Sequence, residues 1–129
     1  MIISEISQNI HENAVEKGFW DGIHGHKLTS EQLCQKLLLI ISEVTEAMEA
    51  DRKNRHCTSD ISYICNYNID EMFITDFEIG VKDTVEDELA DSVIRIFDLA
   101  KKMNINLEKH IEAKNRYNKT RPAMHGKKY

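Results

Sequence analysis

The chain has 129 residues, 41% of them hydrophobic, a size that suits one compact domain spanning residues 1–129 and excludes two independent cores. Its formal net charge of −5 argues against a general nucleic-acid-binding protein. The longest apolar run, residues 37–41, is too short to cross a bilayer, so we expect no nucleic-acid polymer and no membrane among its partners.

Helices are the elements that the composition favours. One proline and five glycines leave long uninterrupted stretches, and apolar residues recur with the period of a helix rather than of a strand, which predicts an all-α bundle. The cysteines, Cys34, Cys57 and Cys65, are odd in number and lack Cys-x-x-Cys spacing, and the first residues lack the pattern of a signal peptide. We therefore expect a cytoplasmic protein.

The N-terminal segment predicts one helix followed by an aromatic connector. Four apolar residues recur at helical spacing within residues 2–17: Ile3, Ile6, Ile10 and Ala14. Gly18 follows as a helix stop. The connector after it concentrates four rings: Phe19, Trp20, His24 and His26. These rings could hold a flat ligand or cover one end of the bundle, and the sequence leaves both alternatives open.

The middle of the chain predicts one long helix and one irregular insertion. Thr29 and Gln32 have the spacing of a capping box, which opens a helix running to about Arg52. Residues 53–80 show mixed polarity and no clean period. We therefore expect an insertion there, with room for one short helix.

Two more helices are predicted toward the C-terminus. Asp83 and Glu86 have capping-box spacing for a helix that ends near residues 103–104, and Asn106 caps a last helix before Pro122. The last helix carries a basic and polar side: Lys114, Tyr117, Asn118 and Arg121. This side suits either phosphate binding or a solvated basic C-terminus that complements the helix dipole.

Two short carboxylate pairs, Glu43-x-x-Glu46 and Glu88-x-x-Asp91, lie inside the two apolar helices. Residues three apart share one face of a helix, so each pair can direct both carboxylates to one point. At about 100° per residue, Glu43 and Glu88 each lie at the border of an apolar stripe on their helix. The predicted stripes are Leu33, Leu37, Ile40, Val44, Ala47 and Met48 on the first helix, and Val85, Leu89, Val93, Ile96 and Ala100 on the second. If the two stripes pack together, both acid pairs flank the same interface.

Four carboxylates at one interface repel one another unless a hard divalent cation compensates their charge. Oxygen-only ligands favour Mg²⁺, with Mn²⁺ as an alternative, and the lack of a Glu-x-x-His spacing argues against a di-iron site. The competing interpretation is a pair of solvated helix faces, because 22 acidic residues make such spacings common.

Together, the two acid pairs and the C-terminal KNRYNKTRPAMHGKKY resemble the MazG-like all-α nucleoside triphosphate pyrophosphohydrolase family. The resemblance implies a four-to-five-helix bundle assembled as a dimer or dimer of dimers. It implies magnesium-dependent hydrolysis of (deoxy)nucleoside triphosphates to the monophosphate and pyrophosphate, a nucleotide-pool house-cleaning reaction. The metal ligands and catalytic residues that it implies are Glu43, Glu46, Glu88 and Asp91. Its implied phosphate contacts are Lys114, Arg116, Tyr117 and Asn118, and its implied base or sugar contacts are Trp20 and His24.

The chain departs from the family pattern in two places. Ser42 stands before Glu43 where the family often has a second glutamate, and the 41 residues between Glu46 and Glu88 exceed the usual separation. The insertion at residues 53–80 accounts for the longer separation. A noncatalytic helical module that senses nucleotides or binds another protein is the alternative, although such a module does not need clustered, mutually repulsive carboxylates.

Overall fold

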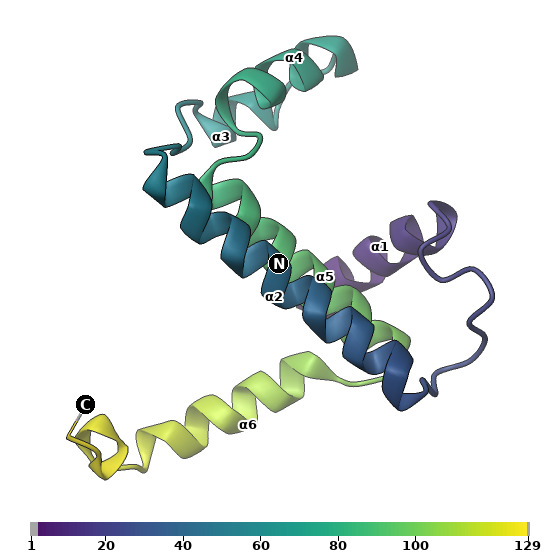
Figure 1. Cartoon of the computed structure of the whole chain (residues 1–129), viewed down its shortest axis with the longest axis vertical. Helices are drawn as coiled ribbons and strands as arrows, with labels where there is room; N and C mark the ends of the chain where they lie inside the picture. Colours follow the sequence, from purple (N-terminus) through teal and green to yellow (C-terminus); the bar gives the residue numbers. More distant parts are fainter. Residues whose placement is uncertain (1–2, 129) are drawn as a thin grey trace. The chain divides into compact units, whose positions relative to one another are not determined.

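The computed structural model describes residues 3–128, apart from the side chain of His125, and over that range the chain is helical with no strand. This confirms the predicted all-α class. Six α-helices and one short 3-10 helix follow one another (Figure 1): α1 (Ile3–Glu16), α2 (Ser30–Arg52), α3 (Ile61–Ile64), α4 (Asp70–Gly80), α5 (Val85–Lys102), α6 (Leu107–Lys119) and η1 (Ala123–Gly126). None of these helices combines the length and the hydrophobicity that a membrane span requires.

The helices form two compact units. The central unit, Thr29–Ile96, holds α2, α3, α4 and the first part of α5. The terminal unit combines the chain up to Leu28 with the chain from Phe97 onward, and it holds α1, the end of α5 and α6. Both acid pairs therefore belong to the central unit.

Local hydrogen bonds explain where most helices begin. The side chain of Thr29 accepts a bond from the backbone N–H of Gln32 at 3.1 Å, and the Gln32 side chain accepts one from the backbone N–H of Thr29 at 2.9 Å. This confirms the predicted capping box of α2. Asn106 caps α6 by accepting a bond from the N–H of Lys109 at 3.1 Å, also as predicted.

The start of α5 corrects the prediction by one residue. Thr84, not Asp83, caps the helix, because its hydroxyl oxygen accepts a bond from the backbone N–H of Asp87 at 3.3 Å. The Asp87 carboxylate accepts one in return from the N–H of Asp83 at 2.9 Å. Glu86 accepts a bond from the backbone N–H of Cys57 at 2.8 Å instead. Asp83 has φ +58°, so it belongs to the turn before the helix.

The insertion is more regular than predicted, since it contains two helices, α3 and α4, rather than one short helix. The end of α4 is fixed to the preceding loop, because Gly80 accepts a bond from the N–H of Thr58 at 2.9 Å. A Cβ at Gly80 would lie 1.9 Å from the Ser59 hydroxyl oxygen, so only glycine allows this approach. Tyr67 donates a bond to Asp76 at 2.6 Å and ties the α3 end to α4.

In the central unit α2 and α5 lie side by side (Figure 1), but their apolar stripes do not pack together. The buried residues of α2 are Glu43, Ala47 and Ala50, and those of α5 within this unit are Glu88 and Ser92. Large apolar side chains on both helices stay exposed: Leu37, Ile41, Val44, Met48, Leu89, Val93 and Ile96. The carboxylates of Glu43 and Glu88 therefore lie within the interface between the helices rather than beside it.

In the terminal unit a polar network fixes the aromatic connector to α5. The indole N–H of Trp20 donates to the two carboxylate oxygens of Asp98 at 2.9 and 3.1 Å. His11 Nδ1 lies 2.6 Å from Asp98 Oδ1, and the Lys102 ammonium donates to the backbone oxygen of Ile23 at 2.7 Å. Trp20 is buried, with 5% of its surface exposed. Trp20 thus contributes to the packing of this unit.

Candidate functional site

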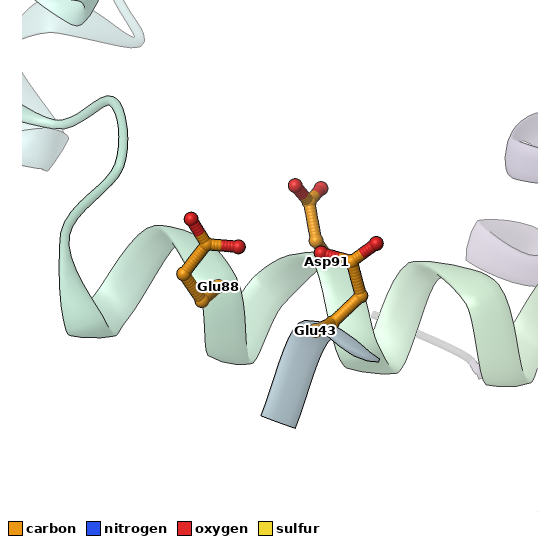
Figure 2. A group of neighbouring side chains, drawn as sticks. All are labelled: Glu43, Glu88 and Asp91. Atoms are coloured by element: carbon orange, nitrogen blue, oxygen red, sulfur yellow. The ribbon is translucent and has the colours of Figure 1, made fainter. Parts of the chain in front are cut away.

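Three of the four predicted acids meet at one point. Figure 2 shows the carboxylates of Glu43 from α2 and of Glu88 and Asp91 from α5 directed toward one another. One oxygen from each lies within 4.8 Å of the other two. The i, i+3 spacing on α5 places Glu88 and Asp91 on one side of that helix, and the adjacent α2 brings Glu43 to them.

Burial makes this group of acids electrostatically costly. Glu43 and Glu88 are 5% and 6% exposed, and Asp91 is more exposed than either. Burial, helped by the negative charge of Glu46 and by the interaction with Glu43, raises the pKa of Glu88 to about 7. Burial and the charges of Asp87 and Glu43 also raise the pKa of Asp91. A bound proton or a cation is therefore favoured at this cluster.

Arg95 is a member of the site that the sequence reasoning missed. Its guanidinium Nε donates to Glu43 Oε1 at 2.5 Å, so it neutralises one of the two buried acids. Arg95 follows Asp91 by four residues, and this spacing puts both on one side of α5. The signal available in the sequence was a basic residue, Arg95, one helical turn after the Glu88–Asp91 pair.

The fourth predicted acid, Glu46, lines the same cleft without joining the three-carboxylate cluster. It is exposed and accepts a bond from the Ser42 hydroxyl at 3.3 Å. A second group of acids, Asp83, Asp87 and Glu88, also has oxygens within 4.8 Å of one another. Asp87 in that group already accepts the N–H bond that shapes the start of α5.

The acids form one wall of a cleft of about 610 Å³ in the central unit. Lys82 and Arg95 are its basic members. Three apolar residues of α4 line it as well: Phe73, Ile74 and Phe77. Small-molecule sites in proteins commonly measure about 300–1,000 Å³, so this cleft has the size of a small-molecule site.

The remaining predicted site residues belong to the terminal unit. Trp20 is buried and His24 is exposed. On α6, the ammonium of Lys114 lies 5.2 Å from the ring centre of Tyr117, and Lys114 and Asn118 line a groove of about 470 Å³. Arg116 is exposed on the same helix. A role of these residues in nucleotide binding remains a prediction.

The three-carboxylate cluster fits a hard divalent cation. Its donors are all carboxylate oxygens, the chemistry that Mg²⁺ and Mn²⁺ prefer. The oxygens lie close enough to share one ion, and burial together with the neighbouring negative charges raises the pKa of Glu88 and of Asp91, which a cation would oppose. Glu43, Glu88 and Asp91 are therefore the residues that would hold it.

Comparison of the chain with known protein families, with curated proteins and with solved structures finds no match in any of the three.

Without metal, we expect stability to fall as the pH rises from about 4.5 to 7, because folded Glu88 holds its proton up to a pKa of about 7. The unfolded carboxyl releases it near pH 4.5, so the folded state binds more protons in this window. This loss of stability should amount to about 1 kcal/mol over the window, since the cluster faces an open cleft, and Glu88→Gln should remove most of it. Thermal unfolding in a chelator measures this. Glu31→Gln, an exposed change on α2, should keep this loss, and an unchanged loss in Glu88→Gln would contradict the assignment.

Arg95→Gln should lower the stability of the metal-free protein and raise its affinity for Mn²⁺. The substitution leaves Glu43 buried without its cation and removes a positive charge that opposes metal binding. We expect Mn²⁺ to bind roughly 3- to 10-fold more tightly, the scale of a screened charge a few ångströms away. Calorimetric titration measures this affinity. Arg52→Gln, which removes an exposed partner of Glu49, is the control, and equal or weaker Mn²⁺ binding by Arg95→Gln would show that Arg95 does not oppose the cation.

Proposed function

We propose that the chain is a magnesium-dependent pyrophosphohydrolase of the MazG-like family that converts nucleoside triphosphates to the monophosphate and pyrophosphate. The observation that carries this proposal is the buried cluster of Glu43, Glu88 and Asp91 at the wall of a cleft of small-molecule size. The cluster is built from the two acid pairs that resemble the family motif.

The burial of Glu43 and Glu88 favours a metal-binding cluster over the alternative of two solvated helix faces. Exposed acids on a helix repel one another weakly, because water screens them. Glu43 and Glu88 are instead almost fully covered. Arg95 compensates Glu43 alone, so the burial of a second carboxylate, Glu88, beside that pair is costly without a further cation, and a structural role alone gives little reason for it.

In the proposed reaction, some residues of the chain position the substrate and another accepts a proton. A bound Mg²⁺ would neutralise phosphate oxygens and orient a water for attack at phosphorus. Lys82 and Arg95 line the cleft and would hold phosphate oxygens by charge-assisted hydrogen bonds. Glu46 lies outside the three-carboxylate cluster, so its carboxylate is free to accept a proton from the attacking water. The pyrophosphate leaves with the electron pair of the broken P–O bond.

The proposed substrates are (deoxy)nucleoside triphosphates, and the proposed task is the removal of unwanted nucleotides from the pool. The family resemblance supports both. It also supports phosphate contacts from the basic side of α6, where the Lys114 ammonium lies 5.2 Å from the centre of the Tyr117 ring. Arg121, which follows the end of α6 at Lys119, lies 5.8 Å from the same ring centre.

We also propose that the chain assembles as a homodimer or homotetramer. On α2 the exposed residues Leu37, Ile41, Val44 and Met48 form one continuous apolar stripe, and Leu89, Val93 and Ile96 form another on α5. Extended apolar surfaces of this kind mark contacts with other molecules. A second copy of the same helix pair would cover both stripes with a matching apolar surface.

Incubation with Mg²⁺ and a panel of canonical and modified nucleoside triphosphates should release pyrophosphate and monophosphate in equal amounts. Glu43→Ala and Asp91→Ala should lower this turnover at least about 100-fold, because each removes a carboxylate that would hold the cation. Glu46→Gln should lower turnover while retaining metal binding. The matched control is Glu49→Ala, which removes an exposed acid of α2 paired with Lys53, and it should retain activity.

Two results would count against the enzyme. Full turnover in Glu43→Ala would remove the carboxylate cluster from the reaction. Binding of Mg²⁺ and nucleotide without turnover would instead favour the nucleotide-sensing module. Full turnover in Glu46→Gln would exclude Glu46 alone as the base.

Light scattering at assay concentration should give a mass of at least about 30 kDa, twice the 15.0 kDa of one chain. Ile41→Lys places a charge within the α2 stripe and should shift the protein toward the single-chain mass. Gln35→Lys, which lies on the opposite side of α2 at about 100° per residue, should leave the mass unchanged. A single-chain mass in the unaltered, active protein would reject the proposed assembly.

A further inference from the structure

The cleft beside the carboxylate cluster has a second wall with a different chemistry. That wall is α4, the longer helix of the insertion, which contributes the apolar residues Phe73, Ile74 and Phe77 and one acid, Glu78. Phe73 and Phe77 are one turn apart, with ring centres 5.7 Å apart and planes inclined by 39°. The cleft is therefore lined both by carboxylates that can coordinate a cation and by an aromatic surface.

The two rings are not core residues of the unit. Gly80 is the one buried residue of α4, and both phenylalanines are only half-buried. Helix α4 is nevertheless held in place, because Tyr67 donates to Asp76 and Thr58 donates to the Gly80 oxygen. An anchored helix that keeps aromatic faces open to a cleft has the arrangement of a ligand-binding surface.

Charge and shape select the occupant. The acid wall with its cation, together with Lys82 and Arg95, suits a polyphosphate group. The Phe73 and Phe77 wall suits a flat ring, and a nucleoside triphosphate carries both groups on one molecule. Stacking of a base on an aromatic side chain contributes about 1–3 kcal/mol and tolerates any base.

We infer that α4 is the base-binding wall of this site, with Phe73 and Phe77 stacking against the nucleobase. The inference rests on the proposed function of the carboxylate cluster. It assigns the base to the insertion at residues 53–80 instead of to Trp20, whose indole is buried and donates to Asp98. Because stacking discriminates little among bases, these two rings provide affinity for a base and little selectivity.

Calorimetric binding with Ca²⁺ in place of Mg²⁺ tests the inference without turnover. The probes are dATP, dCTP, dGTP and dTTP, compared with inorganic tripolyphosphate, which lacks a base. The unaltered protein should bind the nucleotides more tightly than tripolyphosphate. Phe73→Leu and Phe77→Leu keep an apolar side chain and remove the ring, and together they should weaken nucleotide binding roughly 5- to 100-fold. Their binding of tripolyphosphate should change less than about twofold.

Met72→Ala is the matched control, because Met72 is an exposed residue of α4 that does not line the cleft. It should bind all five probes as the unaltered protein does. Circular dichroism and thermal unfolding of each variant verify that α4 remains folded. An equal loss of nucleotide and tripolyphosphate binding in the leucine variants, or no loss of either, would overturn the inference.

The outcome separates this inference from the proposed enzyme. Pyrophosphate release that persists while the leucine variants bind nucleotides normally would reject the base wall and keep the enzyme. A base-dependent loss of binding in a protein that never releases pyrophosphate would support the base wall and move the chain to the nucleotide-sensing class. Equal affinity of the unaltered protein for nucleotides and tripolyphosphate would also reject the base wall.

Discussion

The repulsion among three carboxylates held between α2 and α5 is the constraint on which the central unit depends. Small side chains, Ala47 on α2 and Ser92 on α5, occupy the buried faces beside Glu43 and Glu88, so the two helices carry their acids into the interface. The structure relieves the repulsion in two ways, through the ion pair of Arg95 with Glu43 and through the raised pKa of Glu88. A cation relieves it more completely, which links the stability of the unit to its proposed chemistry.

Helix positions could be predicted because their signals are local. The capping bonds of Thr29 and Asn106 join residues three apart. Gly18, just after the end of α1, has the left-handed φ of +82° that is typical of a glycine that stops a helix. The acid pairs were recognisable for the same reason, since i, i+3 spacing fixes a shared face. At the start of α5 the predicted box of Asp83 and Glu86 does not form, because Asp83 lies in the preceding turn with φ +58° and Thr84 caps the helix instead.

The partners of each helix face could not be predicted, because periodicity identifies a face without identifying what covers it. The sequence left open whether the stripes containing Val44 and Val93 meet each other, and both residues are exposed in the single chain. Arg95 was missed for a related reason, since its partner Glu43 lies 52 residues away along the sequence. The insertion was also underestimated, because a hydrogen bond between Tyr67 and Asp76 and the close approach at Gly80 stabilise it in place of an apolar period.

The same helix pair therefore presents surfaces of opposite character about a quarter turn apart. Glu43 and Glu88 lie on a buried acidic face, whereas Val44 and Leu89 belong to exposed apolar stripes. Glu43 is adjacent in sequence to Val44, and Glu88 is adjacent to Leu89. A rotation of either helix about its axis would therefore move its acidic face and its apolar stripe together. Assembly through the stripes would fix that rotation and hold the carboxylates in the geometry that a cation needs. Binding of a cation would in turn favour the assembled form, because linked equilibria act in both directions.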